Sequence, residues 1–220
     1  MAGIKNNIQN ILRGFPSHVE LVAAAKGRSV GEILEAIEGG IKIFGENYTQ
    51  EAEKKFSIIG SGKVKWHFIG HLQKNKVKKA VKIFDAIETV DSFEIAQAID
   101  KSSAAINKIM EVFIEVNSAK EKNKSGALSE DVEILARRIL ELKNIKLTGL
   151  MTMGPALKNP EDYRPYFKDT KALFDKIKLN LDIKYLSMGM SDSYQIAIQE
   201  GANIVRIGTA IFGPRSLKGV

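Results

Sequence analysis

Short apolar runs rich in β-branched residues alternate along the chain with longer stretches in which apolar residues recur every three or four positions. The short runs predict β-strands, and the longer stretches predict amphipathic helices between them. Eight strands are expected, over residues 19–25, 41–45, 65–69, 86–90, 110–116, 146–151, 185–188 and 203–207.

The expected helices include 48–59 and 74–81, a helix capped by Ser129, and an extra N-terminal helix over 4–12. Alternating strands and helices imply parallel pairing, in a doubly wound open sheet or a closed (β/α)8 barrel. Eight units in about 200 residues favour the barrel. A dinucleotide-binding sheet would carry G-x-G-x-x-G after its first strand, where this chain has Ala25-Lys26-Gly27-Arg28. We therefore expect a single α/β domain over residues 1–220, a TIM barrel with an additional helix before it.

The amino-acid composition of the chain excludes several classes of protein. The chain has 220 residues, and 33 Lys and Arg against 26 Asp and Glu give a formal net charge of +7. It has no cysteine, which excludes disulfides and thiolate chemistry. No apolar run approaches the roughly 18 to 20 residues of a membrane span, and the N-terminus lacks the apolar core of a signal peptide. A cytoplasmic protein with no membrane partner is expected.

Part of the positive charge is concentrated in the lysine-rich segment 63–82, which contains Lys63, Lys65, Lys74, Lys76, Lys78, Lys79 and Lys82. A nucleic-acid-binding protein would use such lysines to neutralise phosphates. No recognition motif and no array of exposed aromatic residues accompanies them. We interpret the segment as a solvated helix face and expect no nucleic-acid partner.

Two groups of candidate residues lie where the strands of a barrel end, which is where barrel active sites are found. Lys26 ends the apolar run Leu-Val-Ala-Ala-Ala-Lys at 21–26. Burial there would lower the pKa of the amine and favour Schiff-base formation with an aldehyde, although a lysine that reaches out to solvent would fit the position equally well. Ser187 ends the seventh strand, and Arg206, Gly208 and Thr209 end the eighth. Loops after these two strands commonly bind phosphate in barrels.

Other polar residues end the second and third strands. Asn47 could orient a polar ligand group, and Glu46 could pair with a nearby cation. His67 and His71 are four residues apart, but on a strand followed by Gly70 they do not share a helix face, so we expect no metal site and interpret His67 as a hydrogen-bonded barrel histidine. A Schiff-base lysine beside a phosphate site fits pyridoxal phosphate (PLP), and a sugar-phosphate aldolase would use similar parts.

From about Val19 to Arg215 the chain closely resembles the pyridoxal phosphate homeostasis protein family, single-domain relatives of the alanine racemase barrel. The resemblance rests on LVAAAK (21–26), FGENY (44–48), WHFIGHLQKNK (66–76), KSG (124–126), LMTM (150–153), LSMGMSD (186–192) and VRIGTAIFG (205–213). It implies that Lys26 forms the internal aldimine with PLP and that Arg206 faces the pyridine nitrogen. It places Ser187, Gly208 and Thr209 in the phosphate-binding segments and Asn47 beside the cofactor ring.

The family is thought to bind and buffer PLP rather than to catalyse a committed reaction. Arginine stays charged, so at the ring nitrogen it would leave that nitrogen unprotonated and the ring a weak electron sink. Alanine racemases take a second acid/base group from a tyrosine in a further domain, and we expect no counterpart of that domain here. A monomeric carrier is therefore expected, with PLP as ligand and PLP-dependent apoenzymes as acceptors. A weak amino-acid racemase and a Schiff-base aldolase are the alternatives.

Overall fold

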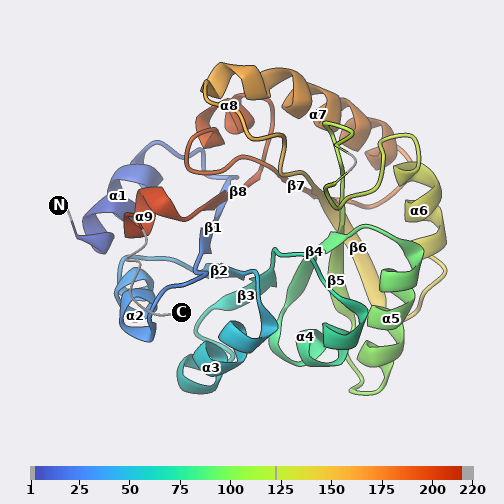
Figure 1. The fold of residues 1–220 in the computed structure, drawn as a ribbon, viewed down its shortest axis with the longest axis horizontal. Helices are drawn as coiled ribbons and strands as arrows, with labels where there is room; N and C mark the ends of the chain where they lie inside the picture. Colours follow the sequence, from blue (N-terminus) through green and yellow to red (C-terminus); the bar gives the residue numbers. More distant parts are fainter. Residues whose placement is uncertain (1–2, 122, 215–220) are drawn as a thin grey trace.

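The eight expected strands are parallel and close into a barrel in chain order, with the last strand paired to the first (Figure 1). The computed structural model describes residues 3–121 and 123–214, so Arg215 and both ends of the expected domain lie outside the described residues. The prediction of a (β/α)8 barrel is confirmed. The strands are β1 (Glu20–Ala24), β2 (Ile43–Glu46), β3 (Lys65–Phe68), β4 (Ala86–Val90), β5 (Met110–Glu115), β6 (Ile145–Met151), β7 (Tyr185–Ser187) and β8 (Ile204–Ile207).

Helices cover the outside of the barrel between successive strands (Figure 1). The α-helices are α1 (Ile4–Arg13), α2 (Val30–Glu38), α3 (Thr49–Ile59), α4 (Val77–Ile83), α5 (Phe93–Ala104), α6 (Val132–Ile139), α7 (Arg164–Lys178), α8 (Tyr194–Gln199) and α9 (Thr209–Phe212). Two 3-10 turns, η1 (Lys74–Lys76) and η2 (Pro160–Tyr163), precede α4 and α7. One cap was predicted wrongly: α6 begins at Val132 after Asp131, because a turn occupies residues 129–131.

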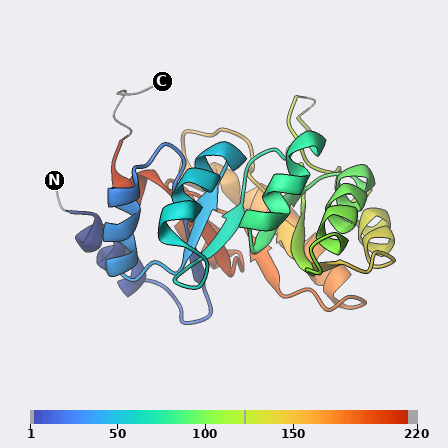
Figure 2. The same ribbon diagram turned by 90° about the horizontal axis from the view of Figure 1, so that it is seen from below.

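The extra N-terminal helix is present as α1 and lies beside both α2 and the last described helix, α9 (Figures 1 and 2). Ile8 on α1 is fully buried, and the Asn7 side-chain amide donates a hydrogen bond to the Ile211 carbonyl at 2.9 Å. The helix therefore supports the segment that follows β8, at one end of the molecule.

Alternate strand residues point into the barrel, and this alternation decides which side chains reach its mouth. Val22, Phe113, Met151 and Ile204 belong to a small core inside the barrel. Val205 belongs to the larger core that the strands share with the helices. A polar residue that ends a strand, just beyond these inward-facing residues, therefore lies at the mouth of the barrel.

The lysine-rich segment 63–82 is organised as the sequence suggested. Lys74, Lys78 and Lys82 are exposed, whereas Val77 and Val81 on α4 are buried against the barrel. This pattern is typical of an amphipathic helix with one solvated face. Within the part of the chain that the structure describes, no helix is both long enough and apolar enough to cross a membrane.

Candidate functional site

A cavity of about 200 Å³ lies at the C-terminal ends of β8, β1 and β2. We call it the Lys26 cavity. These three strands are neighbours in the closed barrel, so the loops that follow them meet at one edge. Five of the six candidate residues line this cavity: Lys26, Asn47, Arg206, Gly208 and Thr209. Positions that are far apart in the sequence are thus brought together, as their places at strand ends predicted.

The sixth candidate, Ser187, lies deeper in the barrel and is absent from the lining of the Lys26 cavity. It is fully buried, and its hydroxyl donates to Glu88 Oε2 at 2.6 Å and accepts from Arg206 Nη1 at 2.6 Å. A direct phosphate contact by Ser187 stays a prediction, and its hydroxyl already has two partners. Ser191, in the loop that follows β7, does line the cavity together with its neighbours Met190 and Asp192. In the sequence it belongs to the motif LSMGMSD at 186–192.

Ser191 connects the loops that follow β7 and β8. Its hydroxyl oxygen accepts hydrogen bonds from the backbone N–H groups of Gly208 at 3.4 Å and Ala210 at 3.3 Å. Gly208 itself lines the cavity, next to Ala24 at the end of β1. Backbone donors therefore converge at this edge of the Lys26 cavity, which is an arrangement that favours an anion.

Arg206 is held rigidly at the floor of the Lys26 cavity. Its Nη2 donates to the Thr152 carbonyl at 2.8 Å, and its Nη1 donates to Ser187 and lies 4.0 Å from Glu88 Oε2. Burial lowers the pKa of Arg206, and the negative charges of Glu88 and Glu115 oppose this shift. The guanidinium thus presents a fixed positive charge with its direction set by three partners.

Glu88 was not identified from the sequence, although it is the residue that orders this floor. It is fully buried, and its Oε1 lies 2.7 Å from His67 Nδ1 while its Oε2 accepts from Ser187. Burial alone would raise the pKa of Glu88, but His67, Arg206 and Ser187 together lower it. A glutamate in the middle of the apolar run 86–90 was the available signal. The expectation that His67 is hydrogen-bonded inside the barrel is confirmed.

The turn that carries Lys26 is anchored from α3. Gly27 has a positive φ of 69°, and its N–H donates to Glu51 Oε2 at 2.9 Å. Lys55 Nζ donates to the Ala25 carbonyl at 2.7 Å and to Glu46 Oε1 at 2.6 Å. Burial raises the pKa of Glu46 to about 7, and Lys55 opposes that rise. Lys55 is therefore the cation that pairs with Glu46.

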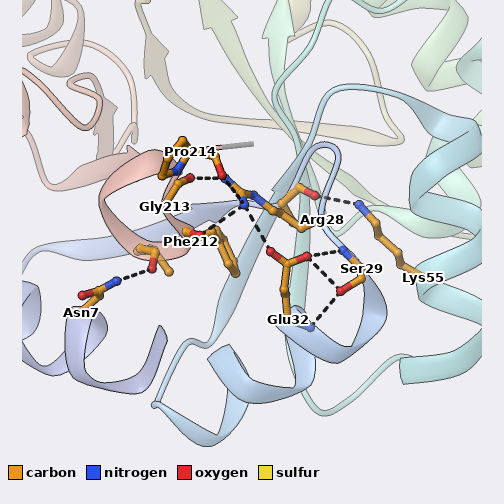
Figure 3. A network of polar contacts seen from close by, with 10 residues as sticks. Asn7, Arg28, Ser29, Glu32, Lys55, Phe212, Gly213 and Pro214 are labelled. Atoms are coloured by element: carbon orange, nitrogen blue, oxygen red, sulfur yellow. Dashed lines mark hydrogen bonds and ion pairs between the residues drawn. The ribbon is translucent and has the colours of Figure 1, made fainter. Parts of the chain in front are cut away.

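Arg28 ties the Lys26 turn to the segment after β8, as Figure 3 shows. Its guanidinium donates to the Phe212 carbonyl at 3.3 Å, to the Gly213 carbonyl, and to the Pro214 carbonyl at 3.5 Å. It also pairs with Glu32 Oε1 at 3.2 Å. The two loops that border the Lys26 cavity are therefore clamped together, a contact that no local sequence pattern indicated.

Asn47 supplies one more polar group to the Lys26 cavity. Its Oδ1 atom is buried and has no hydrogen-bond partner among residues 3–121 and 123–214. A buried acceptor without a donor costs free energy, so a ligand group that donates a hydrogen bond here would be stabilised. The cavity thus combines a primary amine, a fixed guanidinium, converging backbone donors and an unsatisfied amide oxygen.

Comparison with known proteins agrees with this arrangement. Residues 1–216 match the family model described as alanine racemase, N-terminal domain. The pyridoxal phosphate homeostasis protein of Aquifex aeolicus is 42% identical over 198 residues, which cover 89% of this chain and 87% of the relative. The chain belongs to the pyridoxal phosphate homeostasis protein family. Its Schizosaccharomyces pombe member is 38% identical over 217 residues, which cover 96% of this chain and 90% of the relative.

Solved structures give the same family and fold. PipY of Synechococcus elongatus, solved with PLP bound, is 28% identical with a TM-score of 0.88, covering 96% of this chain and 100% of that chain. An alanine racemase of Clostridium difficile is 17% identical with a TM-score of 0.78, covering 99% of this chain and 58% of that chain, and shows the shared fold alone. The family resemblance identified from the sequence motifs is confirmed.

Proposed function

We propose that this member of the family binds PLP in the Lys26 cavity and takes part in PLP homeostasis as a carrier of the cofactor. Relatives that match most of the chain are named pyridoxal phosphate homeostasis proteins, and the PipY structure contains PLP. The observation that carries the proposal is the convergence of Lys26, Arg206, Gly208 and Thr209 on one cavity at the mouth of the barrel.

PLP supplies an aldehyde that condenses with a primary amine, a pyridine ring and a phosphate. Lys26 provides the amine, at the end of β1. Ser191, Gly208 and Thr209 provide hydroxyl and backbone N–H groups for the phosphate, at the edge where those donors converge. Asn47 and Arg206 border the space between these two ends, where a ring would lie.

Arg206 favours storage over catalysis. Its guanidinium donates hydrogen bonds to Ser187 and to the Thr152 carbonyl, and an arginine side chain keeps its proton at physiological pH. A neighbouring ring nitrogen would receive a hydrogen bond from it and no proton. A ring of that kind withdraws electrons weakly, which disfavours transamination and leaves racemase-type chemistry as the accessible reaction.

Racemisation would also need acid/base groups on both faces of the substrate carbon. Lys26 can serve one face. None of the five tyrosines, all of which lie in the described part of the chain, lines the Lys26 cavity; Tyr163 lines a neighbouring cavity and exchanges hydrogen bonds with the backbone of Leu157. A carrier is therefore favoured over a racemase, with PLP-dependent apoenzymes as the acceptors of the cofactor. A monomeric state and a cytoplasmic location stay predictions.

The test is borohydride reduction of the PLP-loaded protein, followed by peptide mapping. We expect a yellow protein whose reduced label lies on Lys26, and Lys26→Ala should lose both the colour and the label while remaining folded. Lys65→Ala is the matched control, because Lys65 is exposed at the opposite end of the barrel. A label on another lysine would contradict the assignment, and a colourless protein that cleaves a sugar phosphate would favour the aldolase.

Turnover measurements separate carrier from racemase. The parent protein should exchange the α-proton of D- or L-alanine slowly or not at all in deuterium oxide. Turnover at about 1 per second or faster, as in ordinary enzymes, would overturn the carrier proposal and restore the racemase.

A further inference from the structure

A second and larger cavity, of about 800 Å³, lies beside the Lys26 cavity at the same mouth of the barrel. It is bordered by the segments that follow β3, β4, β5 and β6, and it shares Met153 and Met190 with the Lys26 cavity. We call it the Glu115 cavity. Its volume is within the range of small-molecule sites, and neither the phosphate edge nor Lys26 belongs to it.

Glu115 is the unusual residue of this cavity. It ends β5 and is 6% exposed, and its Oε1 accepts a hydrogen bond from the Ser125 hydroxyl at 3.2 Å. Its other oxygen, Oε2, is buried and has no hydrogen-bond partner in the part of the chain that the structure describes. A buried carboxylate oxygen without a donor is costly, so a donor that reaches this atom from the cavity that Glu115 lines would stabilise it.

The lysine and the histidine of the Glu115 cavity each lie beside another carboxylate. Lys124 forms an ion pair with Glu121, and His71 Nδ1 lies 3.9 Å from Asp91 Oδ2. The lining therefore has three carboxylates, from Asp91, Glu115 and Glu121, against one lysine and one histidine. Burial raises the pKa of Glu115, and Asp91 adds to this rise; the Ser125 hydrogen bond and the charges of Arg206 and His71 oppose it.

The residues that line the Glu115 cavity indicate which kind of cation it can bind. Among the described residues, no group of three or more His, Asp and Glu side chains is arranged to hold a metal ion. The lining also includes the apolar residues Met153, Pro155 and Met190. A ligand that suits both the carboxylates and these apolar residues has an apolar body and a positively charged hydrogen-bond donor.

We propose that the Glu115 cavity is a binding site for a small organic ammonium compound, whose ammonium group donates to Glu115 Oε2 while its apolar part packs on Met153 and Met190. The site adjoins the Lys26 cavity but uses none of the residues assigned to the cofactor there. The inference therefore goes beyond PLP binding and does not depend on it.

The test is a ligand-observed NMR titration of the full-length, PLP-loaded protein with three probes. Cyclohexylamine is a protonated primary amine at neutral pH, and N,N-dimethylcyclohexylamine is protonated but cannot condense with an aldehyde. Cyclohexanol has the same ring without the charge. Both amines should bind and cyclohexanol should bind at least tenfold more weakly, since hydrogen bonds to charged groups differ from neutral ones by about that factor.

Glu115→Gln tests the residue directly, because it keeps the shape and the acceptor for Ser125 but removes the charge. It should weaken binding of both amines by roughly tenfold or more. Glu111→Gln is the matched control, since Glu111 lies on the same strand, is exposed, and carries the same charge. The control should bind the amines as the parent does.

Three results would overturn the proposal: equal binding of cyclohexanol and the amines, parent-like binding by Glu115→Gln, or equal losses in the two variants. If Glu115→Gln fails to fold, Asp91→Asn takes its place in the test. It should reduce the affinity for the amines about two- to fivefold, as expected for a partly exposed charge. Unchanged amine binding by Asp91→Asn would then refute the site. The tertiary amine is titrated again without PLP. Binding should persist there, so a failure of the cofactor proposal would be recognised separately.

Discussion

The two cavities at the mouth of the barrel are both associated with buried carboxylates, and those carboxylates differ in their partners. Near the Lys26 cavity, Glu46 pairs with Lys55, and Glu88 is hydrogen-bonded to His67 and Ser187 with Arg206 close by. In the Glu115 cavity, the one hydrogen-bond partner of Glu115 among the described residues is the hydroxyl of Ser125. Each carboxylate of the first region thus lies within 4.0 Å of a cationic side chain or a histidine, although Glu46 Oε2 has no hydrogen-bond partner among the described residues. In the second region, the hydrogen-bond donor to Glu115 is a neutral hydroxyl.

This difference matters for the kind of ligand each region can hold. Lys26, Arg28 and Arg206 border the Lys26 cavity, so an anionic ligand meets fixed positive charge there. The carboxylates of the Glu115 cavity favour the opposite charge. The mouth of the barrel therefore has two adjoining cavities, one that favours anionic ligands and one that favours cationic ligands. Arg206 acts on both, because its charge also lowers the pKa of Glu115.

Arg206→Ala should have the largest effect of these variants, and the effect is on the stability of the protein. It would leave Glu88 buried without its neighbouring arginine, which costs about 3 to 5 kcal/mol in the free energy of unfolding when a buried pair loses one member. Urea denaturation of the PLP-free protein measures this loss. Adding Glu88→Gln to the variant should recover part of it, because the uncompensated charge disappears. A double variant no more stable than Arg206→Ala would show that Glu88 does not depend on the guanidinium.

Glu46, a buried carboxylate near the Lys26 cavity, should make the free energy of unfolding depend on pH. Burial raises its pKa to about 7 in the folded protein, from an ordinary value of 4.5. Between these values the folded state binds the proton and the unfolded state does not, so stability falls as pH rises through this window. The loss amounts to about 3 kcal/mol by pH 8.

Glu46→Gln should remove that part of the pH dependence, measured by urea denaturation from pH 4.5 to 8. Glu141→Gln is the control, since Glu141 is exposed and its removal should leave the slope unchanged. A slope that survives in Glu46→Gln would assign the titration to another group.

The sequence was sufficient to predict the barrel and most of the Lys26 cavity, because both follow from local patterns. Alternating strands and helices imply the closed sheet, and a polar residue at a strand end must lie at the mouth. Lys26, Asn47, Arg206 and Thr209 were found in this way. Their roles toward PLP, by contrast, came from the family resemblance.

Contacts that cross the barrel or join distant loops could not be predicted from the sequence. Glu88 and Ser187 are 99 positions apart, and they meet only because closure of the barrel brings β4 and β7 to face each other across its interior. Arg28 reaches carbonyls 184 to 186 positions away. The unpartnered oxygen of Glu115 is likewise a property of three-dimensional packing, since nothing in the run 110–116 distinguishes it.

Thr209→Ala should weaken the preference of the Lys26 cavity for an anionic ligand. Removing one hydrogen bond to a charged acceptor costs about 1.5 to 3 kcal/mol, or roughly a 10- to 150-fold loss of PLP affinity. Pyridoxal, which lacks the phosphate, should bind to the variant nearly as well as to the parent. Equilibrium titrations of both compounds measure this, and equal weakening of both would mean that Thr209 acts on structure and not on phosphate.

Arg28→Lys should have the smallest effect, and it tests whether the clamp between the two loops of the Lys26 cavity contributes to binding. Lysine keeps the charge but lacks the fork that allows Arg28 to reach the carbonyls of Phe212, Gly213 and Pro214 together. Stability should fall by about 1 kcal/mol, and PLP affinity by about two- to fivefold, because the loop with Thr209 is held less firmly. Arg137→Lys is the control, since its pair with Glu133 is exposed on α6 and should contribute little. Similar changes in both variants would show that the carbonyl contacts of Arg28 add nothing specific, and that Ser191 and the backbone suffice to position the edge where phosphate would bind.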